Sequence, residues 1–521
     1  MYWLSQDNHD EFISIRNNTV DHFIRISADS GAEWDIANVV YHFYKDKYRC
    51  ASIKNNIWYE YIGHQWVEID SGGSLRNNIS KFLSRRYGDL STNIVGASSG
   101  GNVDPNMTPE QNERVKNRAL SLSVLATKLK KTNFKQCVMR ECTTVFHEAD
   151  KYFYSRLDKN RMLLGFKNGV FDFTKKEFRA GRPEDYISLN TNIDYVPIDH
   201  DNAKHITIMG EIRDFMKTLF PDETLCEYMW NHLASVMIGG NKPQTFNIYN
   251  GSGRNGKSKL TELMTIILGD YKGVVPITLV TSSRQSIGGL SPEVAQLKGV
   301  RYAVMQEPRK GEKLNDGIMK ELTGEDPIQA RALFKDTITF VPQFKLVVST
   351  NNLFDIGTND EGTWRRIRKV DFESKFVDNP NPTPESPYEF KVDRDIGKKF
   401  EQWKNIFMSM LIERACETMG DVADCDKVTE ASREYRKNQN FLMQFIYEKI
   451  KPGTSNDRLT KTVVYDEFKT WYQVNYGKNV PKGRELYEIL EKKCGKYKNG
   501  WSGYTIAHDG EADYDSDEDS D

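Results

Sequence analysis

The strongest chemical signal in the sequence is the glycine-rich run Gly251-Ser252-Gly253-Arg254-Asn255-Gly256-Lys257-Ser258, which fits the pattern G-x-x-x-x-G-K-[ST]. A strand is predicted before it at 245–249 and a helix after it at 259–268. Backbone N–H groups and the start of that helix would bind phosphates, because unpaired donors and the helix dipole both favour an anion. Lys257 would then neutralise the β- and γ-phosphates and Ser258 would bind Mg²⁺. The alternative is a plain glycine-rich turn.

Two further predicted strands end in polar side chains that suit the same chemistry. The strand at 300–305 leads into Gln306-Glu307, so Glu307 is the candidate to bind Mg²⁺ or to polarise the attacking water. The strand at 344–348 leads to Asn351, whose amide is placed to position water beside a γ-phosphate. A surface turn is the alternative at both positions. We predict an ATP site that uses Mg²⁺, with these nucleotide-binding residues: Gly251, Ser252, Gly253, Arg254, Asn255, Gly256, Lys257, Ser258 and Lys259.

Arg365 and Arg366 follow the third of these strands. Such a position suits an arginine finger, which stabilises the charge of the transferred phosphoryl group. A finger of this kind usually acts on the site of a neighbouring subunit, which implies a ring. A basic surface patch is the alternative, and the sequence leaves open which arginine acts.

The elements that must position these residues form a multidomain α/β protein. Strands and helices alternate over 245–375, as a parallel sheet requires, and 521 residues are too many for one core. The predicted domains are a mixed α+β domain at 1–200, a helical collar at 201–243, an α/β motor at 244–380, a helical lid or linker at 381–430, a small helical domain ending in a hairpin at 431–508, and an acidic disordered tail at 509–521.

Local signals support the outer parts of this layout. They predict an amphipathic helix at 36–47, a hairpin at 58–69, a strand-rich segment at 163–178 with a turn at Asn168-Gly169, and a helix opened by the capping box of Thr108 and Gln111 that ends in the basic run 128–135.

The charge distribution favours a nucleic-acid partner. The formal net charge is −2, but eight acidic side chains lie in the last 13 residues, so the rest of the chain carries about +6. A merely solvated tail fits equally well. The seven cysteines lack paired metal-ligand spacing, which favours reduced thiols in the cytoplasm or nucleus. Neither a signal peptide nor a long apolar run is present, so no membrane association is expected.

Four segments in this order resemble superfamily 3 helicases: GSGRNGKS, VMQEP, residues 320–340 and TWRRI. More specifically, they are similar to the helicase half of the helicase-primases of large cytoplasmic DNA viruses, such as poxviruses. The segments WYEYIGHQWVEID, LLGFKNGVFDF and EDYISLNTNIDYVP resemble the domain that precedes the motor in that family. The main alternative assignment is a phage or plasmid member of the same superfamily.

The resemblance implies an AAA+-like P-loop motor that assembles as a hexameric ring and moves 3′ to 5′ on single-stranded DNA during viral replication, in the cytoplasm of the infected cell or in its nucleus. It also implies a β-hairpin in the central channel, and 329–334 and 337–340 read as its two strands. Lys335 at the turn would contact phosphate. Phe334 would stack on a base or belong to the core.

The resemblance has limits that shape three expectations. The acid motif holds one carboxylate, and no paired-aspartate polymerase site precedes the motor, so no primase activity is expected in this chain. Either a separate primase is the partner, or the sequence is a fragment or part of a split gene. Asp393-Arg394-Asp395 lies after the motor and is expected to be a solvated segment. The C-terminal domain resembles a winged-helix module that contacts duplex DNA or a partner.

Two other classes of protein remain open. One is a P-loop enzyme that acts on a small molecule. The other is a DNA-binding initiator or scaffold in which ATP controls assembly rather than unwinding.

Overall fold

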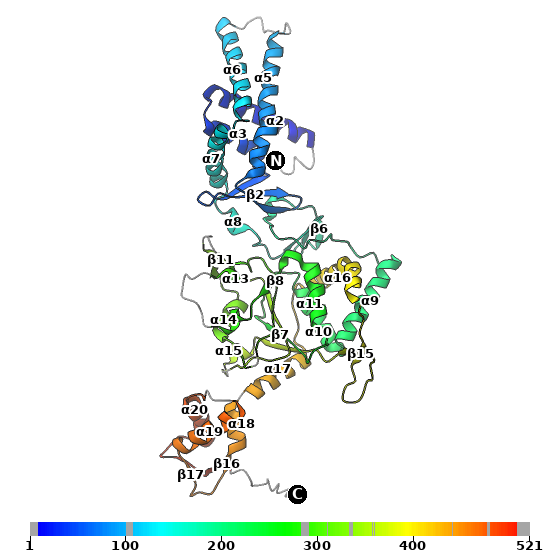
Figure 1. Ribbon diagram of the computed structural model, residues 1–521, viewed down its shortest axis with the longest axis vertical. Coiled ribbons are helices and arrows are strands. Elements are labelled where there is room, and N and C mark those ends of the chain that lie inside the picture. Colours follow the sequence, from blue (N-terminus) through cyan, green and yellow to red (C-terminus); the bar gives the residue numbers. More distant parts are fainter. Residues whose placement is uncertain are drawn as a thin grey trace.

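The computed structural model describes residues 9–99, 108–282, 291–309, 311–332, 337–356, 358, 360–439, 441–476 and 480–507. Figure 1 shows an elongated molecule with a helical N-terminal region at one end, a sheet-containing body in the middle and a small helical unit at the other end. The predicted Lys335 turn and the acidic tail lie outside the described residues.

The N-terminal region packs helices around a three-stranded antiparallel sheet. The capping box is confirmed, since the Gln111 N–H donates to Thr108 Oγ1 at 3.2 Å and the Thr108 N–H donates to Gln111 Oε1 at 2.9 Å. The predicted hairpin at 58–69 is confirmed as β2 and β3, and the predicted helix at 36–47 overlaps α3. The elements are α2 (His9–Ser30), α3 (Glu33–Tyr44), β1 (Tyr48–Ser52), β2 (Ile57–Ile62), β3 (Gln65–Asp70), α4 (Gly73–Asn78), the π-helix η1 (Ile79–Leu83), α5 (Ser84–Ser99), α6 (Pro109–Lys128) and α7 (Thr132–Ala149).

A second antiparallel sheet connects this region to the central body. The predicted Asn168-Gly169 turn joins its first two strands, because Phe166 pairs with Gly169. The buried guanidinium of Arg301 donates to the carbonyl oxygens of Leu163 and Met237, which ties this sheet to the body. The elements are α8 (Phe153–Arg156), β4 (Leu163–Phe166), β5 (Gly169–Asp172), β6 (Glu177–Arg179) and the 3₁₀ turn η2 (Pro183–Asp185).

The central body is built on a five-stranded sheet with the order β13-β7-β12-β9-β8, in which every pair is parallel. The predicted α/β fold with a parallel sheet is therefore confirmed. Nearly every side chain of β7, β9 and β12 is buried, because both faces of the sheet are covered. The strands are β7 (Phe246–Asn250), β8 (Lys272–Val275), β9 (Tyr302–Met305), β12 (Lys345–Thr350) and β13 (Ile367–Asp371).

Different helices cover the two faces of this sheet, because successive side chains of a strand point to opposite sides. Tyr249 and Val347 share one core with α9 (Ala203–Leu219), α10 (Glu223–Ser235), α11 (Lys257–Leu268) and α16 (Ile396–Thr418). Phe246 and Val348 share another core with α12 (Thr278–Thr281), α14 (Asp316–Thr323), α15 (Glu361–Trp364) and α17 (Asp426–Gln439). Thus α16, from the segment expected as a lid, packs in the same core as the two helices expected as a collar.

Short elements fill the connections of the central body. None of the helices in the described part of the chain is both long and apolar enough to cross a membrane. These connecting elements are η3 (Gly269–Tyr271), α13 (Pro292–Ala295), the antiparallel pair β10 (Ile328–Ala330) and β11 (Ile338–Phe340), and the parallel pair β14 (Lys375–Val377) and β15 (Glu389–Lys391).

The C-terminal unit has its own core around Phe445, Phe468 and Trp501. The predicted helical character of this unit is confirmed, but its predicted terminal hairpin is wrong. The strands at 501–502 and 504–506 do not pair with each other; they pair with β17 and β16, respectively. The partner strands lie more than 40 residues earlier in the chain. They are only two and three residues long and one contains a proline, so no local pattern marks them as strands. The elements are α18 (Phe441–Lys449), β16 (Ile450–Pro452), β17 (Arg458–Leu459), α19 (Lys461–Asn475), α20 (Arg484–Cys494), β18 (Trp501–Ser502) and β19 (Tyr504–Ile506).

Candidate functional site

The glycine-rich loop connects β7 to α11, as the sequence predicts. Three of its residues have positive φ: Gly253 at +99°, Arg254 at +54° and Gly256 at +81°. Such a backbone turns successive N–H groups towards one concave side, which suits an anion. A Cβ at position 256 would also overlap Leu219 Cδ2, so any side chain there would have to displace Leu219. The loop is therefore shaped for phosphate and packs directly against the end of α9.

Lys257 opens α11 and is almost completely buried, with 7% of its surface exposed. Its ammonium donates to the Gly251 carbonyl oxygen at 2.8 Å and to Asn351 Oδ1 at 2.9 Å. Burial lowers the pKa of Lys257, and the charge of Glu307 opposes that shift. The lysine is thus a poorly solvated cation beside the loop, and a phosphate oxygen is the acceptor that best compensates such a charge.

Strand order places Asn351 between the loop and Glu307. β12 lies between β7 and β9, so the residues that follow these three strands meet at the carboxyl edge of the sheet. Glu307 Oε1 accepts from the Asn351 N–H at 2.9 Å and from Asn352 Nδ2 at 2.9 Å. The structure therefore brings together Lys257, Asn351 and Glu307. Ser258 is exposed at the first turn of α11, on the same loop.

The segment after β13 holds the loop in place. Asn255 Nδ2 donates to the carbonyl oxygens of Phe372 and Ser374 at 3.0 and 2.7 Å. The Phe376 N–H donates to the Arg254 carbonyl oxygen at 2.8 Å. Ser374 Oγ in turn donates to the Thr218 carbonyl oxygen at 2.6 Å. The loop is thus tied through residues 372–376 to the end of α9.

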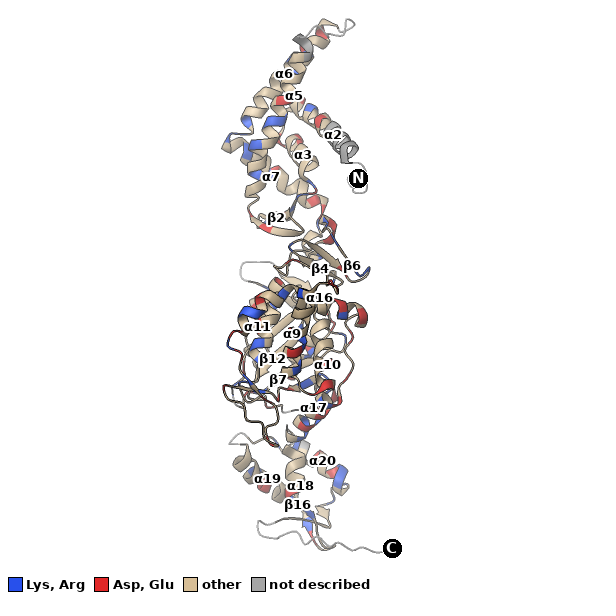
Figure 2. Ribbon diagram, turned by 90° about the vertical axis from the view of Figure 1, so that its right-hand side faces the viewer, with Lys and Arg blue, Asp and Glu red and all other residues tan. Residues whose placement is uncertain are grey.

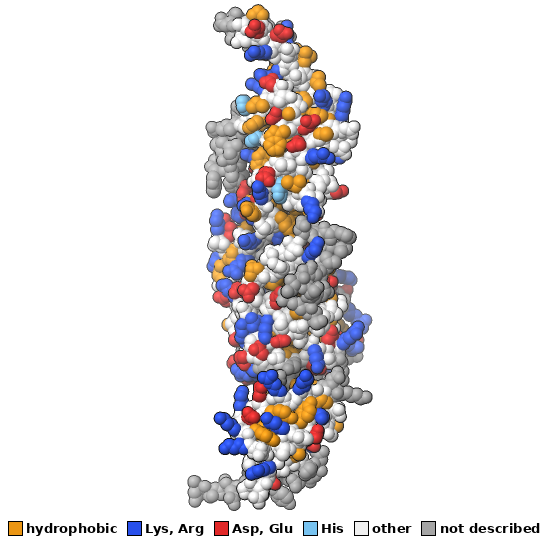
Figure 3. All heavy atoms as spheres, turned by 90° about the vertical axis from the view of Figure 1, so that its left-hand side faces the viewer, with side chains coloured by type: hydrophobic (Ala, Val, Ile, Leu, Met, Phe, Trp, Pro, Cys, Tyr) orange, Lys and Arg blue, Asp and Glu red, His pale blue; other side chains and the backbone are white. Residues whose placement is uncertain are grey.

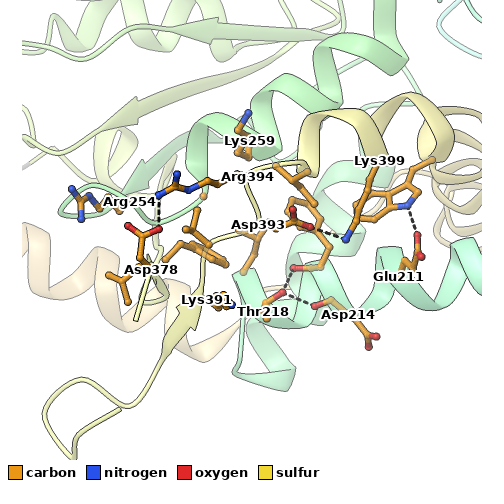
Figure 4. Close-up of a pocket in the computed structure, with 18 residues that line it drawn as sticks. Glu211, Asp214, Thr218, Arg254, Lys259, Asp378, Lys391, Asp393, Arg394 and Lys399 are labelled. Carbon is orange, nitrogen blue, oxygen red and sulfur yellow. Dashed lines mark hydrogen bonds and ion pairs between the residues drawn. The ribbon is translucent and has the colours of Figure 1, made fainter. Parts of the chain in front are cut away.

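A pocket of about 630 Å³ opens beside the loop, on the side of Gly256 and Lys259 (Figure 4). Its apolar wall is formed by Phe215, Leu219, Phe376, Ile396 and Trp403. Its volume and mainly apolar lining are those of a small-molecule site. Sequence reasoning missed this pocket, because its lining comes from four separate segments and none of them has a motif.

Charged side chains surround the opening of this pocket. Figure 4 shows Arg254, Lys259 and Arg394 on its loop side. Arg394 Nη2 donates to Asp378 Oδ1 at 2.8 Å, and Lys399 Nζ donates to Asp393 Oδ2 at 2.7 Å. The segment at 393–395 is exposed, as expected, but two of its residues also line the pocket.

Arg365 and Arg366 lie at the opposite end of the sheet from the loop. The Phe246 N–H donates to the Arg366 carbonyl oxygen, which places both arginines at the amino end of β7, whereas the loop follows its carboxyl end. Five strand residues separate these ends by about 16 Å. Both guanidinium groups donate to Gln244 Oε1, at 2.6 and 2.5 Å. These arginines are therefore remote from their own chain's loop.

The predicted DNA-contacting residues Lys335 and Phe334 lie outside the described residues. The strands on either side are described: β10 and β11 pair antiparallel, with Ile328 opposite Phe340 and Ala330 opposite Ile338. The pairing confirms two short antiparallel strands here, but the first ends at Ala330, since residues 331–332 are not part of it. The contact of the turn with DNA stays a prediction.

Two family models match the chain. Residues 37–221 match a family described as D5 N terminal like, and residues 249–366 match a family of unknown function. The second match covers the glycine-rich loop, Glu307 and Asn351.

Relatives among curated proteins come from large DNA viruses. “Putative helicase L207/L206” of Acanthamoeba polyphaga mimivirus is 34% identical and covers 95% of this chain and 51% of its own length. “Putative helicase 022R” of Frog virus 3 is 28% identical over 92% of this chain and 58% of its own length. “Putative primase C962R” of African swine fever virus is 28% identical over 72% of this chain and 40% of its own length. The chain thus spans about half the length of these relatives.

Among solved structures, the C-terminal region of NrS-1 aligns with 59% of this chain and 67% of its own length, at 13% identity and a TM-score of 0.34. The sequence relatives, together with the D5 match, confirm the resemblance to the helicase-primases of large DNA viruses. The chain is related to the helicase-primase-like proteins of large DNA viruses.

Proposed function

We propose that this chain, a relative of viral helicase-primase-like proteins, is an ATP-dependent DNA helicase of the superfamily 3 type that moves on single-stranded DNA during genome replication in the infected cell. The observation that carries the proposal is the meeting of Lys257, Asn351 and Glu307 beside the glycine-rich loop at one edge of the parallel sheet. A phosphate loop, a strand-end amide and a strand-end carboxylate are the parts that nucleotide hydrolysis needs.

ATP and Mg²⁺ fit the residues present. The concave loop backbone and the Lys257 ammonium would hold the β- and γ-phosphates, and the Ser258 hydroxyl would bind the metal. Mg²⁺ commonly takes only one or two protein ligands besides phosphate and water, so Ser258 and Glu307 suffice. When bound, the metal neutralises charge on the phosphates. Glu307 Oε1 accepts hydrogen bonds from Asn351 and Asn352, and its other carboxylate oxygen would orient the attacking water.

The pocket beside Gly256 suits the nucleoside half of ATP. It begins where the phosphate loop ends, and its wall includes the rings of Phe215, Phe376 and Trp403. A flat base gains affinity from burial against such a wall, and the basic rim at Arg254 and Lys259 suits the α-phosphate side of the ligand.

Arg365 or Arg366 serves as a finger only towards the site of a second copy, because both lie at the far end of their own sheet. The proposal therefore includes a homo-oligomeric ring, hexameric by resemblance, in which Lys335 and Phe334 contact DNA. Primer synthesis is not part of the proposal for this chain, which spans about half the length of its relatives; the primase would be a separate protein or the remainder of a longer one.

The test is displacement of a labelled strand from a forked duplex by the purified chain, with ATP or with a non-hydrolysable analogue. The proposal expects displacement with ATP but not with the analogue. Displacement should be lost in the double variant Arg365→Ala with Arg366→Ala. It should be partly restored when that variant is mixed with Lys257→Ala, since each copy then supplies what its neighbour lacks. A scaffold would leave the fork intact while still assembling on DNA. An enzyme that acts on a small molecule would neither bind the forked duplex nor displace its strand.

A further inference from the structure

A groove of about 630 Å³ lies in the N-terminal region, remote from the phosphate loop. It runs between η1 with the start of α5 on one side and the end of α6 on the other. Ser80, Lys81, Phe82 and Arg85 line the first side, and Ala126 and Lys130 line the second. Lys130 belongs to the basic run at 128–135, which begins at the last residue of α6.

The groove gathers positive charge without matching negative charge. Lys81, Arg85 and Lys130 are exposed, and within the described part of the chain none of them forms an ion pair. One carboxylate, Asp89, stands in the lining. Figure 2 shows Lys and Arg gathered where α6 ends and α7 begins, whereas Figure 3 shows basic and acidic side chains interspersed along the central body.

Two more cations extend this charge beyond the groove. Lys135 on α7 donates to Ser80 Oγ at 2.6 Å, and Ser80 Oγ also contacts the Leu129 carbonyl oxygen at 3.3 Å, so the banks are joined through one serine. Partial burial and the nearby charge of Arg76 lower the pKa of Lys135. Like charges held this close are costly to the folded chain and are relieved by a bound anion.

An aromatic side chain stands among these cations. Phe82 is 56% exposed, an unusual position for a phenylalanine in the middle of a helical segment. It lies in the π-helical turn at Ile79–Leu83, which re-aims the side chains of the helix that it interrupts. Lys81 and Phe82 therefore both face the groove, with Arg85 one turn further on.

We propose that this groove binds single-stranded nucleic acid, with Lys81, Arg85 and Lys130 on the phosphates and Phe82 stacked on a base. Basic side chains that follow the backbone and an exposed ring for the bases are the two components of sequence-neutral single-strand binding. The site is separate from the DNA contact expected at Lys335 and does not depend on the proposed motor function. It gives the N-terminal region a function in binding the single strand, whether or not the chain assembles as a ring.

The first experiment compares two variants of the full chain that each lose one arginine and one lysine from exposed positions. Arg85→Gln with Lys130→Gln removes charge from the groove, whereas Arg114→Gln with Lys116→Gln removes it from the other end of α6. Binding of a fluorescent oligothymidylate is measured without nucleotide over a range of salt concentrations, so that ATP hydrolysis plays no part.

The groove variant is expected to lose about 1.4 from the slope of log affinity against log salt, at about 0.7 for each single-strand phosphate contact. At about 0.1 M salt this corresponds to roughly 25-fold weaker binding if the curves converge at 1 M. The control variant should bind like the unmodified chain. Equal affinities and slopes for the two variants would overturn the proposal.

The second experiment tests the ring of Phe82. Phe82→Leu keeps an apolar side chain but cannot stack, and it should weaken oligothymidylate binding by about 5-fold or more. Phe82→Tyr should restore the affinity. Because Phe82 is largely exposed, neither change should alter thermal unfolding. Equal binding by the leucine and tyrosine variants, or an equal loss of affinity for duplex of the same length, would refute the single-strand assignment.

Discussion

Replacing Glu307 by glutamine tests the chemistry of the candidate site with little change in its shape. Glu307 Oε1 accepts two hydrogen bonds, from the Asn351 N–H and from Asn352 Nδ2, both at 2.9 Å. A glutamine carbonyl oxygen can accept both, so the turn after β12 should keep its conformation and Asn351 should still meet Lys257. What disappears is the negative charge and the ability to take up a proton from water.

The size of the effect follows from that difference. General-base catalysis typically contributes 10²- to 10⁴-fold, or about 3–5 kcal/mol of the activation free energy. ATP affinity should change little, because Lys257 and the loop backbone hold the phosphates. Glu307→Ala should be worse for binding as well, since it also leaves the Asn351 turn without its acceptor.

The assay is single-turnover ATP hydrolysis together with a titration of a fluorescent ATP analogue on the same preparations. We expect Glu307→Gln to slow hydrolysis at least about 100-fold with its nucleotide affinity retained. A variant that hydrolyses ATP nearly as fast as the unmodified chain would show that another group orients the water. A variant that loses nucleotide binding would show that Glu307 acts chiefly on the metal or the loop.

Three further predictions concern the loop, the pocket and the core. Gly256→Ala should abolish nucleotide binding and lower the melting temperature, because its methyl group overlaps Leu219. The methyl group of Gly253→Ala meets open space, so this variant should cost only about 1–2 kcal/mol of backbone strain. Nucleotide titration and thermal unfolding of the two variants measure these effects. Phe376→Ala should weaken ATP binding but leave inorganic triphosphate binding unchanged, and equal losses would contradict the base-binding role of the pocket. Burial lowers the pKa of His232 to about 3, so below pH 6.5 the unfolded chain takes up a proton that the folded chain does not, and stability falls as the pH falls. Urea unfolding should show about 2 kcal/mol less stability from this group at pH 5 than at pH 7, and His232→Gln should remove that loss.

Local spacing was enough to predict the central elements of the candidate site. The eight-residue pattern of the glycine-rich run predicts a turn between a strand and a helix, and the structure has a buried strand before it and a helix that begins at Lys257. The acid and the amide likewise follow their predicted strands. Parallel strands point their carboxyl ends to one edge, and β9 and β12 are neighbours, so Glu307 and Asn351 meet there.

Contacts between residues far apart in the chain could not be predicted from the sequence pattern. The pocket needs α9, the loop, β14 and the start of α16 to converge, and no period or motif encodes that meeting. The final strands pair with 450–452 and 458–459 instead of each other, since burial of Trp501 in the C-terminal core competes with a local hairpin. The bond of Arg365 and Arg366 to Gln244 likewise joins residues more than a hundred positions apart.

The most direct test of the central claim is the rate of ATP hydrolysis by the purified chain, with and without single-stranded DNA, beside Lys257→Ala. Lys257 makes its two hydrogen bonds only within the candidate site, to Gly251 and Asn351. The account predicts hydrolysis that DNA stimulates and that the alanine variant loses. Hydrolysis that ignores DNA, or that persists in Lys257→Ala, would contradict it.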